Sequence, residues 1–397
     1  MAARGHRSAF AWMAGLSVVT LLLGLGREFL IARDLRASGA ADLFFRGLVV
    51  VGAARVVGLS LFRSRWIPAA RERLGVELLR REAAATAGMA AIGIAALLGI
   101  VGVEAWGEPT VWVYTFGVVL ALLGAAFRAL AERAGHERRG FVLEWALPIG
   151  AIVGASALPG GAFGPSLGLV VGLAVGALGV WPAARGPGGH DVKGMSGETG
   201  GRTTALLVDA LVYANLGLLD AALSHLFVVG GFALLNYAYL FVNAAIMVPS
   251  AGATVVALRA AASDPARAHA VLRRWALIGG VAGAGLVLAA GLLFAWAPAA
   301  ALVDGLVGWD VAEQTGRLIV WSAPFAGLRL ANTIGRQALV ASDPRALVAW
   351  DLAGLAGRAA ILGIGVGLVG VVASPIGLAF AEAVQVAAWW RGPRARA

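Results

Sequence analysis

The sequence is poor in the residues that build covalent cross-links, metal centres and catalytic sites. Its 397 residues include no cysteine and five histidines, and only 14% are charged. The lack of cysteine excludes disulfides and thiolate metal sites, and the scattered histidines predict no metal site. A nucleophile elbow and a phosphate loop ending in GK[ST] are also missing. We therefore expect a protein that is not an enzyme and that uses no cofactor.

Apolar residues dominate the chain instead. Hydrophobic residues make up 60% of the sequence, and the mean hydropathy is +0.83. Several apolar runs exceed the roughly 18 residues that distinguish membrane spans from buried core helices. The 56 glycines favour close packing of helices through small faces. These features predict an all-α, polytopic membrane protein.

We expect about 12 transmembrane helices in this chain. The predicted spans are residues 8–33, 40–66, 82–103, 110–131, 141–158, 164–184, 204–229, 231–258, 275–298, 313–339, 346–371 and 373–390. Pro148, Pro249 and Pro324 fall within spans, where proline can kink a helix or free a carbonyl group.

The distribution of basic residues predicts the orientation in the membrane. The net charge of +10 would suit a nucleic-acid-binding protein, but the arginines lie between apolar runs rather than on a soluble basic module. Of the 32 Lys and Arg residues, 24 fall on one side of the predicted spans. By the positive-inside rule this side is cytoplasmic, and it holds both termini. We expect a multi-pass protein of the cytoplasmic (inner) membrane with no nucleic-acid partner.

A polar interruption divides the spans into two groups of six. Residues 185–203 are rich in glycine and lack apolar periodicity, which is typical of a flexible linker. We therefore predict an N-terminal six-helix lobe at 1–184 and a C-terminal six-helix lobe at 204–397. Because six is even, both lobes enter the membrane from one side, which makes them a parallel repeat with a pseudo-twofold axis along the membrane normal. At one constant offset, Glu28 aligns with Asp220, Gly39 with Gly231 and Phe45 with Tyr237.

Five charged residues lie within or at the edges of the first two predicted spans: Arg27, Glu28, Asp42, Arg46 and Arg55. A charge at the centre of a membrane helix costs about 2.5–3.5 kcal/mol on insertion scales, so each needs a partner, a wet cavity or a function. Asp42 and Arg46 are four residues apart on one helix face, which favours a structural pair. Arg27 and Glu28 are adjacent and should point apart. Arg27 and Arg55 thus have no evident carboxylate partner nearby, which favours an anion-binding cavity.

The second half carries fewer embedded cations. Arg329 follows Pro324 by just over one helical turn and has no acidic residue close to it in sequence. It is a second candidate for an anion-binding side chain, and a structural role is equally open. Asp209 and Asp220 are embedded acids within the seventh predicted span.

The opening stretch carries a recognisable pattern. The first span ends in Gly24, Arg27 and Glu28, a turn contains Gly39, and the second span begins with Asp42, Phe44 and Phe45, followed by Arg55 and Pro68. This pattern resembles the N-terminal signature of the MurJ/MviN lipid II flippase family, within the MOP superfamily of drug and polysaccharide exporters. The likeness is divergent, because Leu21, Ser60, Tyr239 and Leu240 stand where the family commonly has charges. We also expect the chain to lack the two C-terminal helices that extend lipid II flippases to fourteen.

The resemblance implies an alternating-access exporter that moves an anionic lipid-linked saccharide to the outer leaflet. The substrate would be lipid II-like or a polyprenyl-diphosphate oligosaccharide, and transporters of this build bind substrate between their halves. We expect a monomer whose partners are this substrate and membrane lipids. The residues expected to hold the pyrophosphate are Arg27, Arg55 and Arg329, and those expected to orient them or exchange with them are Glu28, Asp42 and Arg46.

The energy source and two other functions stay open. The membrane potential or an ion gradient would drive export, and Asp220 is the acid expected to bind a coupling ion. One alternative is a MATE-like antiporter of small molecules, whose cavity should be acidic or apolar, as Asp209 and Asp220 would suit. The other is a degenerate flippase that serves as a non-transporting membrane scaffold, in keeping with the missing family charges.

Overall fold

The described part of the protein is helical. The structure, a computed structural model, describes residues 2–66, 75–134, 136, 139–184, 208, 217–246, 265–307, 311–342 and 344–390. Within these ranges the regular secondary structure consists of α-helices and short 3-10 helices. The predicted all-α fold is therefore confirmed.

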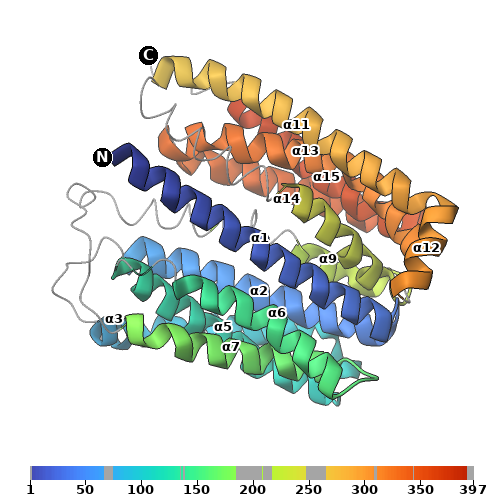
Figure 1. Ribbon diagram of the computed structural model, residues 1–397, viewed down its shortest axis with the longest axis horizontal. Helices are drawn as coiled ribbons and strands as arrows, with labels where there is room; N and C mark the ends of the chain where they lie inside the picture. Colours follow the sequence, from blue (N-terminus) through green and yellow to red (C-terminus); the bar gives the residue numbers. More distant parts are fainter. Residues whose placement is uncertain are drawn as a thin grey trace. The chain divides into compact units, whose positions relative to one another are not determined.

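Most of the helices follow the predicted spans, and parts of the spans 204–229 and 231–258 lie outside the described residues. In chain order they are α1 (Ala2–Leu35), α2 (Gly39–Trp66), α3 (Gly75–Arg81), α4 (Ala83–Val101), α5 (Pro109–Arg133), α6 (Gly140–Ala157), α7 (Phe163–Ala184), α9 (Gly217–Leu223), the helix Gly231–Ile246, α11 (Pro265–Ala295), α12 (Ala297–Val307), α13 (Ala312–Ser342), α14 (Pro344–Val369) and α15 (Ala373–Trp390) (Figure 1). The short helices α3 and α12 were not predicted. Pro298 explains α12, because proline is tolerated in the first turn of a helix but would break the interior of α11 if that helix continued.

Many of these helices are long and apolar enough to cross a membrane. Among the described residues seven such stretches occur. They are Gly39–Arg63, Ala83–Val101, Pro109–Arg133, Gly140–Ala157, Phe163–Ala184, Leu272–Ala295 and Val348–Trp390, the last of which contains most of α14 and all of α15. Ile92 of α4 and Val281 of α11 are 71% and 73% exposed, as expected of helices whose faces contact lipid. The protein is a polytopic α-helical membrane protein, as predicted.

The chain folds into two compact units. One contains residues 22–222, and the other contains residues 1–21 together with 223–397. The predicted linker at 185–203 lies outside the described residues, so the lobe boundaries at 184 and 204 stay a prediction. The predicted repeat does find local support, because Gly39 and Gly231 each begin a helix.

A capped turn separates α1 from α2. Arg36 has a φ of 53°, the left-handed conformation that commonly ends a helix. The Ser38 hydroxyl then accepts a hydrogen bond from the backbone N–H of Ala41 at 3.3 Å. This is the usual role of serine at the position before a helix, where it satisfies a free N–H group.

Tyr114 joins three helices of the unit formed by residues 22–222. Its hydroxyl donates to the carbonyl oxygen of Phe44 in α2 at 2.9 Å and accepts from Ser166 Oγ of α7 at 2.9 Å. Its ring covers Gly47, where an added Cβ would overlap the ring carbons. The side chain is fully buried, so these contacts fix the distances between α2, α5 and α7.

We expect Tyr114→Phe to lower the free energy of unfolding by about 1–3 kcal/mol, because it removes two buried hydrogen bonds and keeps the packing of the ring. Thermal unfolding of the purified protein in detergent measures the change. Ser156→Ala is the matched control, since that hydroxyl is exposed and bonds to the Ile152 carbonyl within its own helix. Equal stability of Tyr114→Phe and the wild type would show that the two bonds contribute nothing.

Glycines allow α6 and α7 to pack backbone against backbone. A Cβ added to Gly168 would overlap the carbonyl oxygen of Gly150, and one added to Gly154 would overlap that of Gly164. Gly172 meets the Ala146 carbonyl in the same way. The small-residue stripes predicted from the glycine content therefore form a real interface.

Candidate functional site

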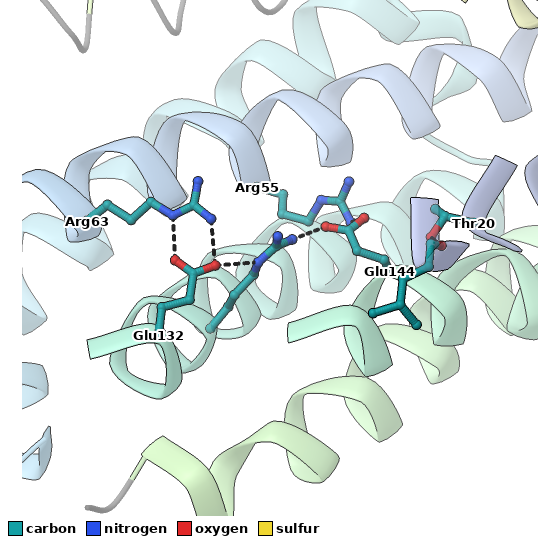
Figure 2. Close-up of polar contacts among 7 residues, drawn as sticks. Thr20, Arg55, Arg63, Glu132 and Glu144 are labelled. Atoms are coloured by element: carbon teal, nitrogen blue, oxygen red, sulfur yellow. Dashed lines mark hydrogen bonds and ion pairs between the residues drawn. The ribbon is translucent and has the colours of Figure 1, made fainter. Parts of the chain in front are cut away.

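One continuous network of charged side chains connects three helices of the unit formed by residues 22–222 (Figure 2). Arg55 and Arg63 come from α2, and Arg128 and Glu132 come from the last turns of α5. Glu144 comes from the beginning of α6. We call these five residues the arginine ladder: Arg55, Arg63, Arg128, Glu132 and Glu144.

The outer end of the ladder is a two-pronged ion pair. Arg63 donates from Nε and Nη2 to the two carboxylate oxygens of Glu132, at 2.6 Å and 2.5 Å. The Nε of Arg128 also donates to Glu132 Oε1 at 3.0 Å, one turn earlier on the same helix. Figure 2 shows Arg63 and Glu132 facing each other in this arrangement. Glu132 thus serves two arginines.

The inner end repeats this sharing. Arg55 Nη1 donates to Glu144 Oε2 at 2.7 Å, and Arg128 Nη1 donates to the other oxygen of Glu144. Arg128 therefore bonds to both carboxylates and joins the two ends of the ladder. Three guanidinium groups share two carboxylates, so the ladder has a net charge of +1.

The ladder begins at helix ends and runs into the membrane span. Arg63 lies near the end of α2 at Trp66, and Glu132 lies next to the end of α5 at Arg133. Cationic side chains are favourable at the C-terminal ends of helices, where the helix dipole is negative. Arg63 is 42% exposed, whereas Glu132 is 11% and Glu144 is 18% exposed. The charge distribution predicts this end to be cytoplasmic.

Arg27 and Glu28 form a second ion pair in α1. Arg27 Nε donates to Glu28 Oε1 at 3.1 Å, and Nη2 donates to the same oxygen. The prediction that these adjacent side chains point apart is wrong, because the long arginine side chain bends back to the carboxylate beside it. Glu28 is 4% exposed, and its Oε2 makes no hydrogen bond within the described residues.

The expectation that Arg27 and Arg55 have no carboxylate partner nearby is also corrected. Arg27 pairs with its neighbour, and Arg55 pairs with Glu144, which is far away in sequence. Both guanidinium groups are mostly buried, with side-chain exposures of 15% and 23%. An anion could bind to either arginine only beside its carboxylate or in place of it.

Three other predicted residues occupy ordered helices. Asp42 is buried in the first turn of α2, and Arg46 lies one turn later with its Nε buried and without a hydrogen bond among the described residues. Their pairing stays a prediction. Asp220 is fully buried in α9, and its role in ion coupling also stays a prediction. Asp209 lies outside the described residues.

Arg329 belongs to a closed polar cluster in the unit that contains residues 223–397. Its Nη1 donates to Glu382 Oε1 at 2.9 Å, from α13 to α15. The second oxygen of Glu382 accepts from Asn332, and Trp389 Nε1 donates to Asn332 Oδ1 at 2.6 Å. Arg329 therefore does have an acidic partner, which the sequence near it did not indicate. Glu382 is only 1% exposed and both of its oxygens are occupied.

Sequence reasoning missed Arg63, Arg128, Glu132 and Glu144 as site residues. The two arginines lie near the ends of the predicted spans 40–66 and 110–131, and the sequence analysis counts them only among the basic residues that predict the orientation. One signal was available, because Arg128 and Glu132 are four residues apart on one helix face within an apolar segment. The pairing of α5 with α6 through Glu144 depends on the fold and has no counterpart in local spacing.

Comparison with solved structures identifies the fold. The chain matches the lipid II flippase MurJ in an inward closed conformation with a TM-score of 0.75 at 12% identity, over 96% of this chain and 87% of that chain. An inward-facing MATE-family multidrug resistance transporter gives 0.63 at 12% identity, over 94% and 93%. A MOP-superfamily transporter from Pyrococcus furiosus, described as having a binding pocket of reversed polarity, gives 0.58 at 13% identity, over 96% and 92%.

These matches extend over nearly the whole of each chain, so the likeness is not limited to one group of helices. No family model matches the sequence, and no curated protein matches it significantly. Similarity at 12–13% identity shows a common fold. The resemblance that the opening stretch predicted is confirmed at this level: the chain has the MurJ-like fold of the MOP-superfamily transporters.

Proposed function

We propose that the protein is an alternating-access exporter that moves an anionic, lipid-linked saccharide to the outer leaflet of the cytoplasmic membrane. The observation that supports this most is the arginine ladder, in which three guanidinium groups share two carboxylates within membrane helices. Guanidinium forks match phosphate oxygens, and a surplus of positive charge in a mostly apolar segment favours an anion. The MurJ-like fold supports the same class of function.

In this proposal Arg27 and Arg55 contact the pyrophosphate of the substrate. Arg329, the contact predicted for the second half, is held by Glu382 and has a structural role in this proposal. The side chains of Glu28, Asp42 and Arg46 orient Arg27 and Arg55 or exchange ion-pair partners with them during the transport cycle. Outward movement of negative charge is favourable where the cytoplasmic side of the membrane is negative, by about 2.3 kcal/mol per charge per 100 mV. Export therefore needs neither catalysis nor a cofactor, and Asp220 is the candidate acid for additional coupling to an ion. The protein acts as a monomer on lipid-linked substrate.

The proposal is tested by reconstituting the protein into vesicles with a fluorescent polyprenyl-diphosphate saccharide and measuring its movement between leaflets. We expect the wild type to accelerate this movement. The double variant Arg27→Ala, Arg55→Ala should be at least about tenfold slower, because each hydrogen bond to a charged phosphate contributes roughly 1.5–3 kcal/mol.

Arg317→Ala is the matched control, since Arg317 is 71% exposed and its ion pair among the described residues is with Glu313 one turn away. It should move substrate at the wild-type rate. Thermal unfolding of each variant separates loss of transport from loss of fold. A double variant that folds and transports at the wild-type rate would contradict the proposed contacts. Export of small cationic drugs instead would favour the MATE-like alternative, and movement of neither class would favour the scaffold.

A further inference from the structure

We propose that Glu132 and Glu144 are exchangeable counter-ions that occupy the phosphate positions of the arginine ladder until a diphosphate headgroup displaces them. The proposal rests on the proposed function and extends it to four residues that the sequence did not indicate. Arg63 and Arg128 become anion contacts that precede Arg55 along the path. The ligand chemistry is a diphosphate ester or a free diphosphate.

The sharing of carboxylates is the first argument. Each glutamate accepts from two arginines, and Arg128 donates to both glutamates. Arg55 and Arg63 each bond to one carboxylate, so an arriving phosphate takes the place of that carboxylate. The displaced carboxylate keeps its bond to Arg128, so the exchange leaves neither an arginine nor a glutamate as an unpaired charge in an apolar segment.

Geometry is the second argument. The two parallel bonds from Arg63 to Glu132, at 2.6 Å and 2.5 Å, are the fork arrangement that guanidinium also makes with phosphate. Glu144 likewise places its two oxygens on two different arginines. Each carboxylate thus stands where two oxygens of a phosphate group would bind.

The positions of the arginines along the helices are the third argument. Arg63, at the end of α2, is 42% exposed, and Arg55 further along the helix is 23% exposed. Eight residues of helix separate them, a rise of about 12 Å. Arg128 is 16% exposed and bonds to the glutamate partners of both. An anion arriving at the end of α2 that is predicted to be cytoplasmic therefore meets Arg63 first and reaches Arg55 by way of Arg128.

The Arg329 cluster shows what a fixed pair looks like in the same protein. Glu382 is 1% exposed and is bonded to an arginine and a buried amide. Glu132 and Glu144 are 11% and 18% exposed, and among the described residues the hydrogen bonds to their carboxylates come from arginine side chains. Glu132 and Glu144 are therefore better placed than Glu382 to be displaced by an anion from solvent.

The test measures binding of two probes, inorganic pyrophosphate and farnesyl diphosphate, to the full-length protein in lipid nanodiscs. We expect Glu144→Gln to bind diphosphate about tenfold more tightly, because a competing unit charge beside the anion is removed. The same variant should transport more slowly, because the headgroup is released less readily. If Glu144 had a purely structural role, Glu144→Gln should bind diphosphate more weakly than the wild type, because the arginines would lose the carboxylate that holds them in place.

Glu313→Gln is the matched control, because Glu313 pairs with exposed Arg317 outside the ladder, and it should change neither binding nor transport. Tightening for both probes supports the proposal with phosphate chemistry as the recognised feature. Tightening for farnesyl diphosphate alone supports it with a lipid as the source, and tightening for pyrophosphate alone supports it with a free ion as the source.

Unchanged or weaker binding of both probes by a folded Glu144→Gln variant would overturn the proposal. If that variant does not fold, Glu132→Gln is judged by the same criterion, and failure of both to fold would show that the carboxylates are purely structural. Wild-type protein that binds neither probe and moves no substrate contradicts the proposed function itself. Wild-type protein that binds and transports, with no tightening in the variants, contradicts only the exchange.

Discussion

Gly168→Leu should prevent α6 and α7 from packing and should leave little folded protein. A Cβ at this position already overlaps the carbonyl oxygen of Gly150 and crowds the Cα of Gly154. Because the obstacle is backbone, no side-chain rotation can relieve it, and the two helices must move apart. The cost should exceed the roughly 1–3 kcal/mol of ordinary overpacking. Yield of monodisperse protein and thermal unfolding in detergent measure the effect.

Gly99→Leu is the matched control for this substitution. Gly99 lies in α4, its added Cβ would meet nothing within 4 Å, and the helix is apolar. The same change of residue should be neutral there or slightly stabilising, since leucine favours helix more than glycine does. Gly168→Ala should fall between the two, because its single methyl group already overlaps backbone. Normal folding of Gly168→Leu would show that α6 and α7 do not pack through these glycines.

Hydropathy predicted the helices well because a membrane span must satisfy its own backbone hydrogen bonds over a fixed length. The predicted span 164–184 and the observed α7, Phe163–Ala184, nearly coincide. The short helix α12 was missed because its 11 residues carry no length signal of that kind. The break between the predicted spans 204–229 and 231–258 is found at the predicted place, because a helix begins at Gly231, while α9 ends earlier, at Leu223, and is followed by a 3-10 turn at Ser224–Leu226.

The charges were harder to interpret than the helices. The sequence showed correctly that Arg27 and Arg55 are embedded, because hydropathy locates them along a span. It did not show their partners, because Glu144 reaches Arg55 only through the packing of α6. The sequence counts Arg63 and Arg128 only toward orientation, since a residue near a helix end looks the same in sequence whether it faces water or another helix. Partners across helices are a property of the fold.

The two charge clusters differ in a way that matters for function. The arginine ladder has more cations than anions and is partly exposed along its length. The Arg329 cluster places one carboxylate between one arginine and one buried amide, so its hydrogen bonds are balanced. An anion would gain a partner at the ladder, whereas at Glu382 it would have to break a completed set of bonds. The arginine ladder is therefore suited to binding an anion, and the Arg329 cluster is suited to stabilising the fold.

Glu382→Ala should destabilise the protein by about 3–5 kcal/mol, the cost expected when one member of a buried ion pair is removed. The substitution takes away the carboxylate to which Arg329 and Asn332 both donate, in a site where Glu382 is 1% exposed. Asn332 in turn accepts from Trp389, so the loss extends to the contact between α13 and α15. Thermal unfolding in detergent should show a large fall in Tm.

Two comparisons separate this cause from a general effect of the substitution. Glu382→Gln keeps an acceptor oxygen and nearly the same volume, so it should lose less stability than Glu382→Ala. Glu313→Ala removes an exposed partner of Arg317 and should change stability by less than about 1 kcal/mol. If Glu382→Ala were as stable as Glu313→Ala, Arg329 would have another arrangement in the membrane. Arg329 would then be as open to an anion as Arg55, and the difference drawn between the two clusters would not hold.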